Sequence, residues 1–86
     1  MIDDRSVEEL NMVDHELHRA FVFLNGARMA DSKEYKQQLW TKAIGALERA
    51  KQLAVRVPKD LVPPYWNFSF SEVQSRLSKI DAEGAS

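Results

Sequence analysis

The apolar residues between Leu39 and Ala54 constrain the fold of this chain more than any other feature of its sequence. At 100° per residue they cover roughly 200° of a helical wheel, whereas a helix at the surface of a domain has a narrower apolar stripe. The set consists of Leu39, Trp40, Ala43, Ile44, Ala46, Leu47, Ala50, Leu53 and Ala54. A face this broad needs two partners. We therefore predict a helix over residues 32–55 that is the central element of a bundle.

A second helical pattern precedes this one, over residues 7–28. Its apolar residues recur at spacings of three and four and fall on one face of a helix. They are Leu10, Val13, Leu17, Ala20, Phe21, Leu24 and Ala27. The turn around residues 29–31 is so short that the two helices must form an antiparallel hairpin.

A third and shorter helix is predicted over residues 70–82, where Phe70, Val73, Leu77 and Ile80 form a narrow apolar stripe. The preceding residues 57–68 contain three prolines, which forbid a continued helix and favour extended backbone. This segment also carries several aromatic side chains, which we expect to pack against the rest of the domain. We predict an extended strap that runs back along the hairpin.

The same capping signal opens each predicted helix, a Ser or Asp followed three residues later by Glu. The pairs are Ser6 with Glu9, Asp31 with Glu34, and Ser69 with Glu72. The third start also has Phe68 and Val73 at the spacing of a hydrophobic staple. Together these patterns predict one all-α domain over residues 1–86, a three-helix bundle made of a helical hairpin and a shorter third helix.

The composition argues against several classes of protein. There is no cysteine, which excludes a disulfide framework, a thiolate zinc site and a cysteine nucleophile. A small domain without disulfides fits a reducing compartment. The first residues are polar and acidic, and no apolar run long enough for a signal peptide or membrane span follows them. We expect a cytoplasmic protein with no membrane association.

His15 and His18 are the only candidates for metal ligands that draw attention. Zinc proteases place two histidines four residues apart on a helix, whereas these lie three apart and point away from the apolar stripe. We interpret them as exposed surface residues and predict no metal site and no cofactor. No arrangement of nucleophile and base and no glycine-rich phosphate loop is recognisable. The sequence therefore predicts no catalytic residue and no enzymatic activity.

The charge is unevenly distributed along the chain. The net charge is −1, but residues 35–60 hold six basic and two acidic residues, or +4. Lys42, Arg49 and Arg56 are seven residues apart on the polar face of the second helix, and Lys59 follows. Such a row could bind an acidic protein surface or the phosphates of a nucleic acid. The plainer interpretation is a solvated helix face.

Met12 and Phe23 lie off the apolar stripe of the first helix, and two interpretations stay open. The strap or the third helix could cover them, or they could form an exposed patch for a partner or a second copy of the chain. Tyr65 and Trp66 leave a similar choice. They could form a docking element for a partner, or a lid on the hairpin in which the Trp66 indole N–H donates to a carbonyl.

From these surfaces we predict a small non-enzymatic protein-interaction module, acting as a regulator, adaptor or inhibitor. It would bind a protein partner, or a second copy of itself, through a helix face. The predicted partner-binding residues are Met12, Phe23, Tyr65 and Trp66, together with the basic row. The alternative is a nucleic-acid-associated protein that binds through Lys42, Arg49, Arg56 and Lys59.

Overall fold

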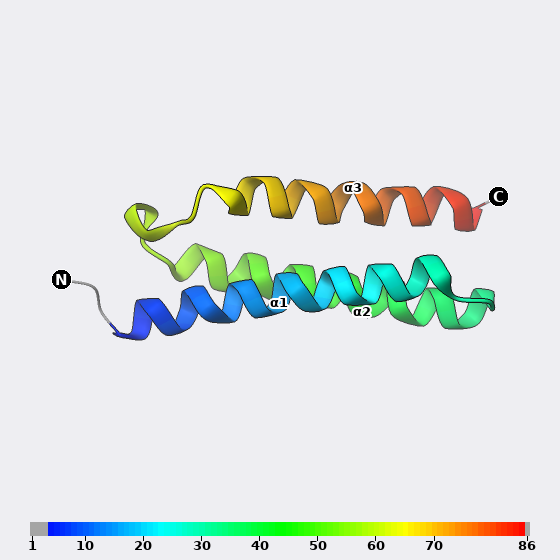
Figure 1. Ribbon diagram of the computed structural model, residues 1–86, viewed down its shortest axis with the longest axis horizontal. Coiled ribbons are helices and arrows are strands. Elements are labelled where there is room, and N and C mark those ends of the chain that lie inside the picture. Colours follow the sequence, from blue (N-terminus) through cyan, green and yellow to red (C-terminus); the bar gives the residue numbers. More distant parts are fainter. Residues whose placement is uncertain (1–3, 86) are drawn as a thin grey trace.

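Three helices lie side by side along the length of the molecule (Figure 1). In this computed structural model, which describes residues 4–85, α1 spans Asp4–Met29, α2 spans Lys33–Arg56 and α3 spans Tyr65–Ala85. A short 3₁₀ helix, η1, covers Lys59–Leu61 between α2 and α3. The described residues contain no strand, so the prediction of an all-α three-helix bundle is confirmed.

The helices run alternately up and down the bundle, so that α1 and α3 are each antiparallel to α2 (Figure 1). The molecule is elongated, with extents of 51 × 17 × 16 Å. The long axis follows from the helix lengths, because 26 residues of α1 at 1.5 Å each span about 39 Å.

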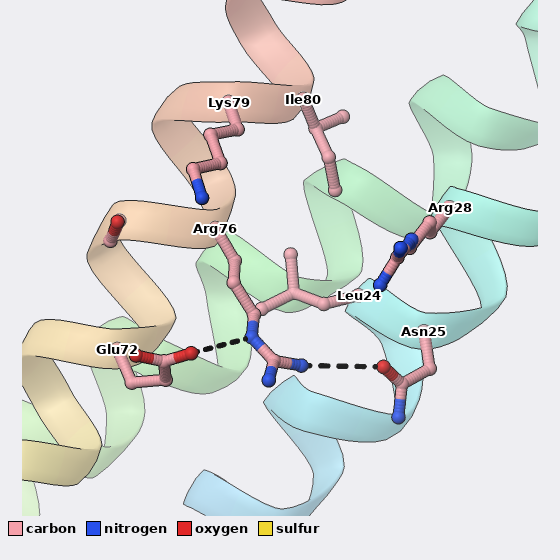
Figure 2. Close-up of a pocket in the computed structure, with 8 residues that line it drawn as sticks. Leu24, Asn25, Arg28, Glu72, Arg76, Lys79 and Ile80 are labelled. Carbon is pink, nitrogen blue, oxygen red and sulfur yellow. Dashed lines mark hydrogen bonds and ion pairs between the residues drawn. The ribbon is translucent and has the colours of Figure 1, made fainter.

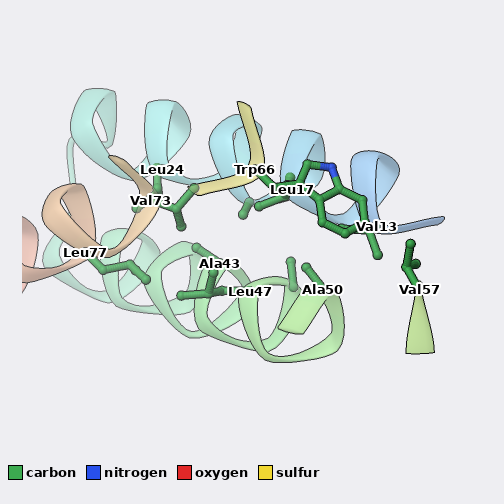
Figure 3. Packing of buried hydrophobic residues seen from close by; sticks show 12 residues of the cluster. Val13, Leu17, Leu24, Ala43, Leu47, Ala50, Val57, Trp66, Val73 and Leu77 are labelled. Atoms are coloured by element: carbon green, nitrogen blue, oxygen red, sulfur yellow. The ribbon is translucent and has the colours of Figure 1, made fainter. Parts of the chain in front are cut away.

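The core runs along the seam between the helices, and Figure 3 shows most of its side chains. Alanines of α2 with no exposed surface, such as Ala43, Ala46 and Ala50, let the backbone of α1 approach closely. The remaining core residues are Val13, Leu17, Ala20, Leu24, Ala27, Leu39, Leu47, Val57, Trp66, Val73 and Leu77. The hairpin of α1 and α2 forms the largest interface, and α3 packs on both of its helices.

The helix predicted to be central does contact two partners, but so does every helix of the bundle. The broad apolar face of α2 is used on one side by α1 and on the other by α3. On the α3 side, the Trp40 indole Nε1–H donates a hydrogen bond of 3.2 Å to the Leu77 carbonyl oxygen. In a three-helix bundle no element is uniquely central, because each one lies in the groove between the other two.

The start of α3 differs most from the sequence prediction. The helix begins at Tyr65, five residues before the predicted position, and the Trp66 amide donates to the Pro63 carbonyl oxygen over 3.1 Å. Proline lacks only an N–H that the first helical turn cannot use. Pro63 and Pro64 therefore precede the helix directly and do not hold the chain extended. The predicted strap over residues 57–68 is wrong at its C-terminal end and is interrupted by η1.

Because the helices begin at other residues than predicted, the predicted cap residues are wrong as well. The cap of α2 is Ser32, whose Oγ accepts from the Tyr35 amide at 3.1 Å, and not the neighbouring Asp31. Because α1 begins at Asp4 and α3 at Tyr65, Ser6 and Ser69 lie inside helices and cap neither. The predicted staple is also wrong, since Phe68 is 72% exposed while Val73 is buried.

Candidate interaction surfaces

The helix α1 has two polar flanks, one on each side of its buried stripe. One flank carries Asp14 and Asn25, whose side chains hydrogen bond to residues of α3. The other flank carries Glu16 and Phe23, which contact the polar edge of α2. At 100° per residue the two flanks are about 160° apart, so the interactions on them involve different partners and are described separately.

We name the surface that includes Glu16 and Phe23 the hairpin face. It is the side of the hairpin opposite α3, formed by one polar flank of α1 and the polar edge of α2. Its residues are Glu9, Met12, Glu16, Arg19, Phe23, Lys42, Gly45, Arg49 and Arg56.

The centre of the hairpin face is a carboxylate shared by two arginines. Arg49 Nε donates to Glu16 Oε2 over 3.2 Å, and Arg19 Nη1 donates to Glu16 Oε1 over 3.3 Å. The Glu16 side chain is only 13% exposed, whereas those of Arg19 and Arg49 are 43% and 53% exposed. The carboxylate is thus covered by its two partners, while both guanidinium groups still reach solvent.

Phe23 extends this arrangement towards the turn of the hairpin. Its ring centroid lies 5.6 Å from Arg19 Cζ and 5.9 Å from Lys42 Nζ, within the range of cation–π interaction. The ring is half-buried. The sequence left open whether α3 or a strap covers Phe23 or whether it is exposed for a partner. Neither interpretation applies fully, because two cations partly cover the ring.

The remaining predicted residues, Met12, Arg56 and Lys59, are more exposed than Phe23. Met12 lies one turn before Glu16 on the same flank and is 51% exposed. Arg56 and Lys59 are exposed, and Lys59 belongs to η1. Among the described residues of the hairpin face, four cations stand against two carboxylates. The face therefore remains positive after its internal pairing.

A separate cluster joins the start of α3 to α1 through Asp14. The Tyr65 hydroxyl donates to the Asp14 carboxylate, with distances of 2.9 and 2.8 Å to its two oxygens, and Trp66 Nε1 donates to Oδ1 over 2.9 Å. Trp66 is 2% exposed, so it belongs to the core and not to an exposed patch. The predicted lid is present in this form, but the indole binds a carboxylate and not a carbonyl.

Tyr65 is partly exposed in this cluster. Its residue surface is 51% exposed although its hydroxyl is bonded. The hydrogen bond to Asp14 raises the pKa of the Tyr65 phenol, and burial and the negative charge of the same carboxylate act in the same direction. Each of these effects favours the protonated phenol, which is the form that donates to Asp14.

Asp14 was not singled out from the sequence, although a signal was present. It lies four residues after Leu10 and three before Leu17, at the edge of an otherwise apolar stripe. A carboxylate in that place must find donors, because an unpaired charge is costly to bury. Such an acid indicates an interhelical contact, and its donors are Tyr65 and Trp66, two of the aromatic residues singled out from the sequence.

A third surface, a polar pocket of about 350 Å³, lies between α1 and α3 near the other end of the bundle (Figure 2). Arg76 occupies its middle, where Nε donates to Glu72 over 3.0 Å and Nη1 donates to Asn25 over 3.4 Å. The Arg76 guanidinium also lies 5.3 Å from the centroid of the Phe21 ring. These contacts use Arg76 to join the two helices.

The histidines are placed as predicted, since both His15 and His18 are exposed on α1. Within residues 5–80, whose side chains are described, no three potential ligands of the types His, Cys, Asp and Glu come together as a metal site would require. In the described part of the chain, no helix combines the length and apolarity needed to cross a membrane.

No protein-family model matches this sequence, and the comparisons with curated proteins and with solved structures also give no match. The surfaces of the chain itself are therefore the basis for proposing a function.

Proposed function

We propose that this chain is a non-enzymatic protein-interaction domain, acting as a regulator, adaptor or inhibitor, that binds an acidic protein partner through the hairpin face. One observation carries the proposal. The apolar residues Met12 and Phe23 and the basic row of α2 lie on one surface, because Phe23 contacts Lys42 and Glu16 contacts Arg49.

The composition of the hairpin face supports this function. Met, Phe and Arg are enriched at protein interfaces, where apolar groups at the centre are ringed by polar ones. Here the half-exposed Met12 and half-buried Phe23 lie beside four cations. Methionine also adapts its shape to irregular partner surfaces. Such a face suits a partner that presents both apolar and acidic side chains.

The elongated shape of the molecule also supports the proposed binding function. The accessible surface of 6224 Å² exceeds the roughly 5,200 Å² expected for a compact monomer of this mass. The radius of gyration is 14.4 Å, against about 12 Å for a compact domain of this length. The elongated hairpin therefore offers a binding face long enough for another protein.

Two other occupants are less well supported by the same geometry. A nucleic acid would have to approach Arg49 beside the Glu16 carboxylate, which repels phosphate. A second copy of the chain would bring two positive faces together in a symmetric dimer, which costs free energy. An acidic protein also meets the Glu16 carboxylate, but it can place its acidic groups beside Lys42 and the exposed part of Arg49, whereas a nucleic acid carries phosphates all along its backbone.

Photo-crosslinking in the native cell tests the proposal. A photoreactive amino acid at position 12 should capture a partner, whose dissociation constant is then measured with the purified domain. Lys42→Glu with Arg49→Glu should weaken binding by about tenfold or more, while the melting temperature changes by only a few degrees.

Lys51→Glu with Lys79→Glu is the matched control, since it makes the same charge change on exposed residues outside the hairpin face. Equal losses with both double variants would show bulk electrostatic attraction and contradict a specific site. A captured nucleic acid, with affinity falling steeply as salt rises, would support the alternative function.

A further inference from the structure

A glycine with no evident role inside the molecule lies in the middle of the hairpin face. Gly45 follows Lys42 by three residues and precedes Arg49 by four, in the interior of α2. Only proline is less favourable than glycine inside a helix. A Cβ at this position would meet only the terminal Nη1 of Arg49, at 3.7 Å, which is ordinary contact with a flexible side chain. Packing within the domain therefore does not require a glycine here.

Gly26 provides the contrast within the same hairpin. A Cβ there would lie 3.1 Å from Leu39 Cδ1, closer than side chains normally pack. Gly26 therefore allows α1 and α2 to approach each other. Packing within the fold thus accounts for Gly26 and not for Gly45.

We propose that Gly45 is the point at which an acidic helix of the protein partner crosses α2. This inference rests on the proposed function and specifies the partner's chemistry. A residue without a side chain permits close approach of another backbone, and the distance between helix axes depends on the side chains at the crossing. The cations on either side of Gly45 then bind carboxylates of the partner.

The spacing of the cations specifies the partner further. Lys42 and Arg49 are seven residues apart, so they lie about 10 Å apart along one side of α2. A helix that runs along this row can match them with two acidic residues seven apart on its own surface. Small residues between these acids would let its backbone reach Gly45.

The neighbouring groups leave both cations able to bind. Arg49 uses Nε for Glu16, but its side chain is 53% exposed and a guanidinium has five N–H donors. Lys42 lies over the face of Phe23, which holds the ammonium without neutralising it. The Glu16 carboxylate beside this row is already shared between Arg19 and Arg49. Glu48, which is exposed and three residues after Gly45, borders the row, but within the described residues no ion pair joins it to Lys42 or Arg49.

A synthetic helical peptide serves as the probe. It has roughly 20 residues, long enough for an isolated helix, with blocked ends and an alanine background, and glutamates seven apart on one face. Binding is measured at low ionic strength by fluorescence anisotropy of the labelled peptide and mapped by amide chemical shifts. A peptide with glutamine in place of glutamate controls for charge.

Gly45→Ala and Gly45→Leu test the crossing. Gly45→Ala should raise the melting temperature by about 3–6 °C, because alanine favours the helix, yet weaken peptide binding about threefold or more. Gly45→Leu should reduce binding by about tenfold or more. Gln74→Leu is the matched control at an exposed residue of α3, outside the hairpin face, and should bind as the unmodified domain does.

The outcomes separate this inference from the proposed function. If Gly45→Leu binds the peptide normally while Lys42→Glu with Arg49→Glu does not bind, the crossing point is wrong and the acidic-partner function stands. If neither variant alters binding, both are wrong. Absence of binding to the glutamate peptide, or equal binding of the glutamine peptide, would overturn the acidic helix as the occupant.

Discussion

Replacing Asp14 by alanine should destabilise the domain through one group in particular. Asp14 accepts hydrogen bonds from the Tyr65 hydroxyl and from the Trp66 indole. When the carboxylate is removed, the half-exposed Tyr65 can donate to water instead. Trp66 is 2% exposed and its N–H has no such alternative.

The expected magnitude follows from that difference. A buried donor left unpaired costs about 1–3 kcal/mol, and an exposed hydrogen bond replaced by water costs about 0.5 kcal/mol. Asp14→Ala should therefore lower the free energy of unfolding by about 2 kcal/mol. For a domain of this length, that corresponds to a fall in melting temperature of about 8–16 °C.

The assay is thermal and urea unfolding followed by far-UV circular dichroism, with double-mutant cycles that assign the cost. Combined with Trp66→Phe, which removes the indole donor, Asp14→Ala should cost less than about 1 kcal/mol. Combined with Tyr65→Phe, it should cost nearly as much as it does alone. An undiminished cost in the Trp66→Phe background would refute the assignment to the indole.

Three further perturbations have expected outcomes. In a Tyr35→Phe variant, which leaves Tyr65 as the only tyrosine, the phenol should titrate above the usual value near 10 and return towards it when Asp14 is replaced by Asn. Because the folded-state pKa is raised, this stabilisation is complete below about pH 10 and is lost as the pH rises through the folded value, measurable by urea unfolding. Leu24→Ala, at a residue only 2% exposed, should cost about 2–5 kcal/mol in the same assay. Glu16→Gln should cost less than about 1 kcal/mol, because its arginine partners are largely exposed, and should tighten binding of the acidic peptide; a loss of binding would contradict the role given to Arg49.

The hairpin of α1 and α2 could be predicted from the sequence, because the apolar spacing that indicates each helix is local and repeated. The predicted ranges 7–28 and 32–55 differ by only a few residues from Asp4–Met29 and Lys33–Arg56. Apolar spacing over six or more turns leaves little choice of structure, and a three-residue turn leaves little choice of arrangement. The helix ends were less certain, because adjacent residues such as Asp31 and Ser32 are both capable caps.

The start of α3 could not be fixed in the same way. Pro63 and Pro64 are compatible both with an extended strap and with the residues that precede a first helical turn. The choice depends on whether Trp66 can reach the core, where Figure 3 shows it together with Leu17. Its indole also bonds to Asp14, and the local sequence does not give the positions of these two partners in space. A tertiary contact therefore determines where α3 begins. A prediction from neighbouring residues alone misses both this boundary and the Asp14 cluster.

The unity of the hairpin face depends on the register between two helices. Moving seven residues back along α1, from Phe23 to Glu16, and seven forward along α2, from Lys42 to Arg49, leads from one observed contact to the next. Each step is about two helical turns, so the two rows stay aligned in an antiparallel pair. The sequence contains both rows but not the register, so from the sequence alone the Met12 and Phe23 patch and the basic row are separate candidates on two helices. Once they are aligned, α1 supplies the carboxylate that neutralises the middle of the row, and this favours a partner with placed acidic groups over one that offers only a uniform negative field.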